Sequence, residues 1–174
     1  MRRLQKNTYA RAVAIACFSL IALCLLTLDL FTKRLFFDDT LLDPSPRFSF
    51  FGGFIQHFLH ANLGASFNAP LPVPILLVAA LLFCGWLLLF LFSHSSHWKH
   101  PLVLLSAAAV FGGALGNMYD RFMLGYVRDW ILLGYRTIAN IADFSVLFGC
   151  LGMLAYSLLL PSRQTRPPVE RSGT

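Results

Sequence analysis

Four stretches of this chain are apolar, almost free of charge and long enough to cross a membrane as helices. They cover residues 12–30, 71–92, 101–119 and 143–160. A helix needs about 20 mostly apolar residues to span about 30 Å of hydrocarbon, where its backbone polar groups must be satisfied internally. The pattern predicts an all-α membrane protein, a four-transmembrane-helix bundle forming a single domain over residues 1–160.

The composition agrees with a membrane protein and excludes other classes. Hydrophobic residues make up 57% of the 174 residues and charged residues 13%, and the mean hydropathy is +0.66. These values exclude a disordered chain and are unusual for a soluble domain. The net charge of +6 comes from basic residues scattered between apolar stretches, so no nucleic-acid partner is expected.

The cysteines and histidines indicate neither a metal site nor a cofactor. Every cysteine lies inside an apolar stretch, without the CxxC spacing of a zinc site or the pattern of a disulfide framework. No histidine has metal-ligand spacing from a carboxylate cluster. We expect His57 and His60 at the membrane interface and the other histidines in a polar loop over 93–100, with no metal and no cofactor.

The charge distribution predicts how the spans cross the membrane. Most basic residues lie in the termini and the 93–100 loop, whereas every aspartate lies at or beyond the opposite ends of the spans. Because cytoplasmic loops are enriched in Lys and Arg, both termini are expected in the cytoplasm. The alternative of a cleaved signal peptide at the N-terminus is less favoured, because its apolar run is long and lacks a small-residue cleavage site.

The loop over 31–70 is then extracytoplasmic, and it contains two short aromatic segments. Residues 47–51 and 54–58 are expected as strands about a turn at Gly52 and Gly53, forming a small β-sheet at the bilayer surface. The tail over 161–174, rich in Pro, Arg and Ser, is expected to be disordered and cytoplasmic.

Two segments at the outer ends of neighbouring spans repeat one pattern, an Asn three residues before an Asp. They contain Asn117 with Asp120 and Asn140 with Asp143. On helices this spacing brings the Asn and Asp side chains to neighbouring positions, and two adjacent helices would bring the carboxylates together. Two close carboxylates share one proton, which gives one base and one acid, as in an aspartic protease.

The same residues are also compatible with a structural role or with transport. A lone Asp at a helix start is usually a cap, and Gly112, Gly113 and Gly116 indicate close packing of helices. A structural scaffold would use the Asn and Asp residues only to hold helices together. A small transporter could use paired aspartates as a proton relay, although none lies near the midplane of a span.

Five short motifs follow one another along nearly the whole chain outside the polar tail. They are DLFTK at 29–33, NLGASF at 62–67, GALGNMYDR at 113–121, VRDW at 127–130 and NIAD at 140–143. This ordered set resembles bacterial lipoprotein signal peptidase, or signal peptidase II. The resemblance implies an aspartic endopeptidase of the bacterial inner membrane, which cleaves diacylglyceryl-modified prolipoproteins on the amino side of the lipidated cysteine.

The resemblance also implies roles for individual residues. Asp120 and Asp143 would be the catalytic pair, and Asn117 and Asn140 would orient that pair or the substrate. Asp129 would bind the substrate or orient the pair. Four other motif positions have both a structural and a functional interpretation; they are Asp29, Lys33, Asn62 and Arg121. Asp29 and Lys33 could tie the end of a helix, Arg121 could bind a lipid phosphate or Asp129, and Asn62 could order a turn. The partners expected are prolipoprotein and membrane lipid, with the enzyme a monomer.

Two residues depart from the family pattern. Ala139 stands where the family usually has Phe, and Arg128 interrupts a normally apolar stretch. We expect neither to touch a carboxylate, and both to alter the shape of the substrate groove. We also expect the aromatic loop with Phe48, Phe50 and Phe54 to lie over the site as a lid that holds the substrate.

Overall fold

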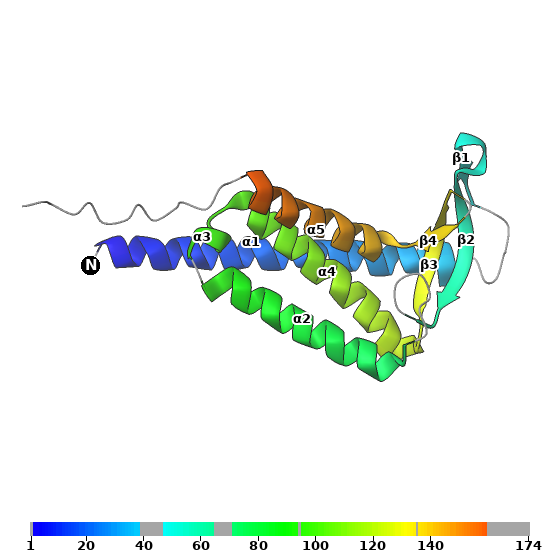
Figure 1. Cartoon of the computed structure of the whole chain (residues 1–174), viewed down its shortest axis with the longest axis horizontal. Helices are drawn as coiled ribbons and strands as arrows, with labels where there is room; N and C mark the ends of the chain where they lie inside the picture. Colours follow the sequence, from blue (N-terminus) through cyan, green and yellow to red (C-terminus); the bar gives the residue numbers. More distant parts are fainter. Residues whose placement is uncertain (1, 39–46, 65–70, 94, 135, 160–174) are drawn as a thin grey trace, which may run out of the picture.

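Four long helices dominate the computed structural model, which describes residues 2–38, 47–64, 71–93, 95–134 and 136–159. They are α1 (Arg2–Lys33), α2 (Val73–Ser93), α4 (Pro101–Leu124) and α5 (Ile141–Leu159), and each is long and apolar enough to cross a membrane. A short helix α3 (Ser95–Trp98) joins α2 to α4. α4 packs against the other three long helices, as Figure 1 shows. The predicted four-helix bundle is confirmed.

The helix ends differ from those predicted by hydropathy. α1 begins at Arg2 rather than near residue 12 and continues into a π-helical turn, η1 (Arg34–Asp38). α4 continues beyond residue 119 to Leu124, where Gly125 adopts φ 81° and donates its N–H to the carbonyl of Arg121 over 3.2 Å. This left-handed glycine is a common helix end. Asp120 therefore lies within the helix. The apolar run alone had predicted that the helix ends just before this residue.

A four-stranded antiparallel sheet covers one end of the bundle, which we call the sheet end (Figure 1). Its strands, in spatial order, are β1 (Ser49–Phe50), β2 (Ile55–Asn62), β3 (Val127–Leu133) and β4 (Thr137–Ala139). The predicted aromatic hairpin is confirmed as β1 and β2, joined by the 3-10 turn η2 (Phe51–Gly53). β3 and β4 were not predicted. β2 pairs with β3, which brings together two loops that are far apart in the sequence.

Small residues let α4 approach two helices at once. A Cβ on Gly112 would lie 2.6 Å from the carbonyl oxygen of Ala22 in α1, and one on Gly113 would lie 2.5 Å from that of Ala142 in α5. Both distances are too short for a side chain, so the glycines allow direct backbone contact. This packing brings the sheet ends of α1, α4 and α5 together. The tail over 161–174 lies outside the described residues.

Candidate active site

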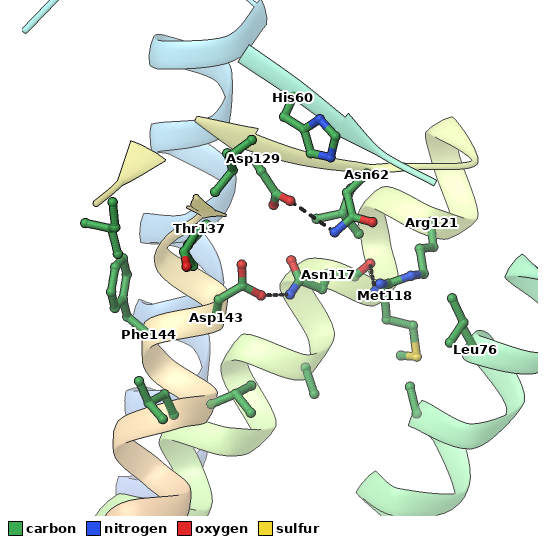
Figure 2. Close-up of a pocket in the computed structure, with 18 of the residues that line it drawn as sticks. His60, Asn62, Leu76, Asn117, Met118, Arg121, Asp129, Thr137, Asp143 and Phe144 are labelled. Atoms are coloured by element: carbon green, nitrogen blue, oxygen red, sulfur yellow. Dashed lines mark hydrogen bonds between the residues drawn. The ribbon is translucent and has the colours of Figure 1, made fainter. Parts of the chain in front are cut away.

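A cavity of about 800 Å³ lies at the sheet end, between the sheet and helices α2, α4 and α5. Its polar wall, shown in Figure 2, includes His60, Asn62, Asn117, Arg121, Asp129 and Asp143. Its apolar wall runs along the three helices and includes Leu76, Ala80, Ala114, Val146, Leu147 and Cys150. The cavity therefore joins a polar end to an apolar surface that continues between the membrane spans.

Two carboxylates are found among the described residues that line this cavity, those of Asp129 in β3 and Asp143 in the first turn of α5. Figure 2 shows them on either side of one space, with Asn117 and Asn62 beside them. Asp129 is 1% exposed, and Asp143 is half-buried. Among the described residues, Asp129 and Asp143 are therefore the two carboxylates that meet in the cavity.

Asp143 is held at the start of α5 by reciprocal bonds with Asn140. The Asp143 N–H donates to Oδ1 of Asn140 over 2.9 Å, and the Asn140 N–H donates to Oδ2 of Asp143 over 3.1 Å. This is a capping-box arrangement, which satisfies two free backbone donors of the helix start. Nδ2 of Asn117 donates to the other oxygen, Oδ1 of Asp143, over 2.8 Å. Both asparagines therefore bond to Asp143, and their expected orienting role stays a prediction.

Asp129 accepts hydrogen bonds on both of its oxygens. Nδ2 of Asn140 donates to Oδ1 over 2.7 Å, and Nδ2 of Asn62 donates to Oδ2 over 3.1 Å. Asn62 also orders a turn, as one interpretation of the sequence predicted, because its Oδ1 accepts the N–H of Gly64 over 3.0 Å. Burial, together with the nearby charge of Asp143, raises the pKa of Asp129 from 3.8 to about 7.

Asp120 lies outside the set of described residues that line the cavity. Its side chain is fully buried, and its oxygens accept bonds from Nζ of Lys33 (3.1 Å) and Nη2 of Arg128 (2.7 Å). Three residues of an α-helix turn through about 300°, which leaves Asn117 and Asp120 about 60° apart around α4. Although the two positions are close, Asn117 lines the cavity, while Asp120 contacts Lys33 of α1 and Arg128 of β3. The expected pairing of Asp120 with Asp143 does not match this geometry.

Lys33 occupies the centre of a buried network behind the cavity. Its Nζ lies 2.7 Å from Oδ2 of Asp29 and donates to Oδ1 of Asn117 over 2.9 Å, besides its contact with Asp120. The side chains of Lys33, Asp29 and Asp120 are all 0% exposed. Oδ1 of Asp29 also accepts the N–H of Ala142 over 2.8 Å. The predicted Asp29–Lys33 pair is therefore present, and it links α1 to α4 and α5.

Three other sequence-selected residues differ in how well their positions were predicted. Arg121 lines the cavity, but its Nη2 donates to the carbonyl of Gly64 over 2.9 Å, in place of the suggested pairing with Asp129. Ala139 lines the cavity, where a larger side chain would change its shape. Arg128 contradicts the expectation that it touches no carboxylate, because it binds both Asp120 and Asp38. These contacts of Arg128 were not predicted, because the sequence did not reveal that the chain turns at Gly125 and returns along α4 as strand β3.

Asp38 was not selected from the sequence, where it is one of several loop aspartates without a recognisable motif. His57, expected at the interface, is buried with its Nε2 2.6 Å from the carbonyl oxygen of Phe36.

Within the described ranges, no group of three or more His, Cys, Asp or Glu side chains is arranged to hold a metal ion.

The aromatic residues of the expected lid lie on the β1–β2 hairpin and just before it. Phe48 packs against Trp130 at a ring-centroid distance of 6.1 Å, whereas Phe50 and Phe54 are more than half exposed. These three side chains are not among the described residues of the cavity wall. The lid therefore stays a prediction.

Comparisons with known proteins match most of the chain. The profile of the family described as signal peptidase (SPase) II matches residues 21–159. A lipoprotein signal peptidase of Moorella thermoacetica is 32% identical over 152 residues, covering 87% of this chain and 99% of its own length. One from Teredinibacter turnerae is 35% identical over 140 residues, covering 74% and 79%.

Solved structures support the fold. A bacterial membrane enzyme matches 90% of this chain and 96% of its own with a TM-score of 0.73 at 24% sequence identity. A second bacterial membrane enzyme structure matches 85% and 96%, with a TM-score of 0.72 at 25% identity.

Proposed function

Since the chain belongs to the signal peptidase II family, the aspartic-type peptidases of family A8, we propose that it cleaves prolipoproteins with Asp129 and Asp143 as its catalytic pair. The observation that carries this assignment is the position of both carboxylates in one cavity, where Asn140 bonds to both of them. Asp120, the other candidate from the sequence, is bonded to Lys33 and Arg128 and has a structural role.

The burial of the two carboxylates suggests different tasks for them. Asp143 is half-buried, whereas Asp129 is 1% exposed, and we assign the role of general base to the more accessible Asp143. Asp129, with a pKa raised to about 7, retains a proton near neutral pH and suits a general acid. A single proton is then held by the pair, as in other two-carboxylate enzymes.

The reaction follows from these tasks. A water between the carboxylates loses a proton to Asp143 as its oxygen attacks the scissile carbonyl carbon, while Asp129 donates its proton to the carbonyl oxygen. The C–N bond of the tetrahedral intermediate then breaks as the departing nitrogen takes the proton from Asp143. Asp129 recovers its proton from the hydroxyl group as the new carboxylic acid forms.

The apolar wall of the cavity suits a substrate that cannot leave the bilayer. A diacylglyceryl-modified prolipoprotein would place its acyl chains and apolar signal segment against α2, α4 and α5, and its scissile bond at the polar wall. Cleavage would then occur on the amino side of the lipidated cysteine. The monomeric state stays a prediction.

The test is incubation of the purified protein with a diacylglyceryl-modified prolipoprotein, with product masses measured by mass spectrometry. We expect a lipoprotein that begins at the lipidated cysteine. A wild-type protein that folds but leaves this substrate intact would refute the proposal, and proton flux in liposomes would then test the transporter alternative.

The orientation in the bacterial inner membrane is also part of this proposal. The concentration of basic residues at the termini supports a cytoplasmic location for both ends and an outer location for the cavity. Alkaline phosphatase, which folds only outside the cytoplasm, should therefore be active when fused after residue 64 and inactive when fused after residue 159. Activity of the fusion after residue 159 would reverse the orientation.

The raised pKa of Asp129 predicts how cleavage depends on pH. Below pH 7 the acid is protonated, and above pH 7 it loses its proton, so kcat/KM should fall about tenfold per pH unit on the alkaline side. The folded chain also binds this proton between about pH 4 and 7, where an unfolded chain would release it, so the stability from this group declines as pH rises. A pH–rate profile that stays flat to pH 9 would contradict the assignment of Asp129 as the acid.

A further inference from the structure

Arg128 is a buried arginine next to Asp129 in β3, and the reaction described above does not use it. Its side chain is 8% exposed. Its Nε and Nη2 donate to Oδ1 of Asp120 over 3.2 and 2.7 Å, and its Nη1 donates to Oδ2 of Asp38 over 2.5 Å. A buried guanidinium is tolerated only when it is paired. These pairings join β3 to α4 and to η1.

The backbone of Arg128 is held as firmly as its side chain. Its N–H donates to Oδ2 of Asp120 over 3.0 Å, and its carbonyl accepts a longer bond of 3.5 Å from Nδ2 of Asn140. Successive residues of a strand point to opposite faces of the sheet. With Arg128 fixed on the face toward α4, Asp129 is directed to the other face, toward the cavity and Asp143.

The charge of Arg128 also affects how Lys33 is shared. Lys33 binds Asp29, Asp120 and Oδ1 of Asn117 at the same time. If Arg128 lost its charge, Asp120 would keep Lys33 as its cationic partner and attract it more strongly. Lys33 would then hold Asn117 less well, and Nδ2 of Asn117 is the donor that orients Asp143.

We propose that Arg128 is a positioning residue for the reaction, which sets the relative geometry of Asp129 and Asp143 through its clamp on Asp120 and Asp38. It is not among the described residues that line the cavity, so it acts on the pair and not on the substrate. This role presupposes the proposed function. This role would explain why a charged residue, Arg128, stands in a stretch that the sequence analysis expected to be apolar.

The test compares steady-state kinetics of purified full-length variants on a synthetic diacylglyceryl lipopeptide that spans the cleavage site. Arg128→Met should lower kcat by about 10²-fold and change KM less than about 2-fold, because a small misplacement of catalytic groups slows chemistry without weakening uniform binding. Arg128→Lys should recover about a tenth to a half of wild-type kcat, because lysine keeps one ion pair but loses the forked contact.

Two further variants separate this role from a general effect of charge or folding. Asp38→Asn removes the outer half of the clamp from a side chain that is 42% exposed, so it should fold and lower kcat by about 5- to 10-fold. Arg34→Met removes an exposed positive charge from the same turn, η1, and should leave kcat within about 2-fold of wild type.

The results distinguish failure of this role from failure of the proposed function. An inactive wild type refutes both. With an active wild type, an unchanged kcat in Arg128→Met, or a raised KM with unchanged kcat, refutes the positioning role alone. Arg128→Lys no better than Arg128→Met also refutes it. If Arg128→Met does not fold, an unchanged kcat in Asp38→Asn decides against the role.

Discussion

Asp129→Asn and Asp143→Asn should each lower kcat/KM for prolipoprotein cleavage by about 10⁴-fold while the protein stays folded, because each removes one of the two proton-transfer groups. Asp129→Asn should also raise the midpoint of thermal unfolding at pH 8, because it removes a carboxylate whose charge is disfavoured by burial and by Asp143. Cleavage kinetics and thermal unfolding in detergent, measured on the same preparations, provide both results.

Asp120→Asn is the matched control for these two variants. It makes the same chemical change in an aspartate that is fully buried but bonded to Lys33 and Arg128. It should lower thermal stability, because Lys33 and Arg128 each lose one of their two charged partners, and the activity of each folded molecule should fall far less than in the other two variants. The reverse outcome, an inert but stable Asp120→Asn beside an active Asp129→Asn, would return the catalytic role to Asp120.

Lys33→Met should destabilise the protein by about 3–5 kcal/mol, because it removes the cation between two fully buried carboxylates. Reversible unfolding in mixed detergent micelles measures this change. Lys6→Met is a suitable control on the same helix, since Lys6 is exposed and its loss should change stability by less than about 0.5 kcal/mol. Equal stability of the two variants would show that the network around Lys33 contributes little to the fold.

The bundle and most of the site components could be predicted from the sequence. The spans follow from the length of the apolar stretches, because lipid leaves few alternatives for a backbone. The hairpin follows from the aromatic segments around Gly52 and Gly53. Asn117, Asn140 and Asp143 follow from the repeated Asn–Asp spacing, which reports local geometry on a helix. All of these are short-range features of the chain.

The sequence interpretation placed Asp120 in the catalytic pair, whereas the function proposed above places Asp129 there. The proposed assignment depends on α4 continuing to Leu124 and on β3 pairing with β2, in the register that sets Asp129 opposite His60. A shift of one residue in that register would direct Arg128 to the cavity and Asp129 away from it. Pairing between distant segments is not visible in local pattern, and the contacts of Arg128 were missed for the same reason.

The network at the sheet end has a consequence for how the protein is made. Lys33 comes from the first span and Asp143 from the last, and Asn117 bonds to both. During synthesis the first span enters the membrane long before the last one leaves the ribosome. A nascent chain that stops before Asn140 lacks Asp143, the proposed base, and the bonds that orient it. On the proposed assignment, peptidase activity arises only once the chain has been made beyond Asp143, so shorter nascent chains should be inactive.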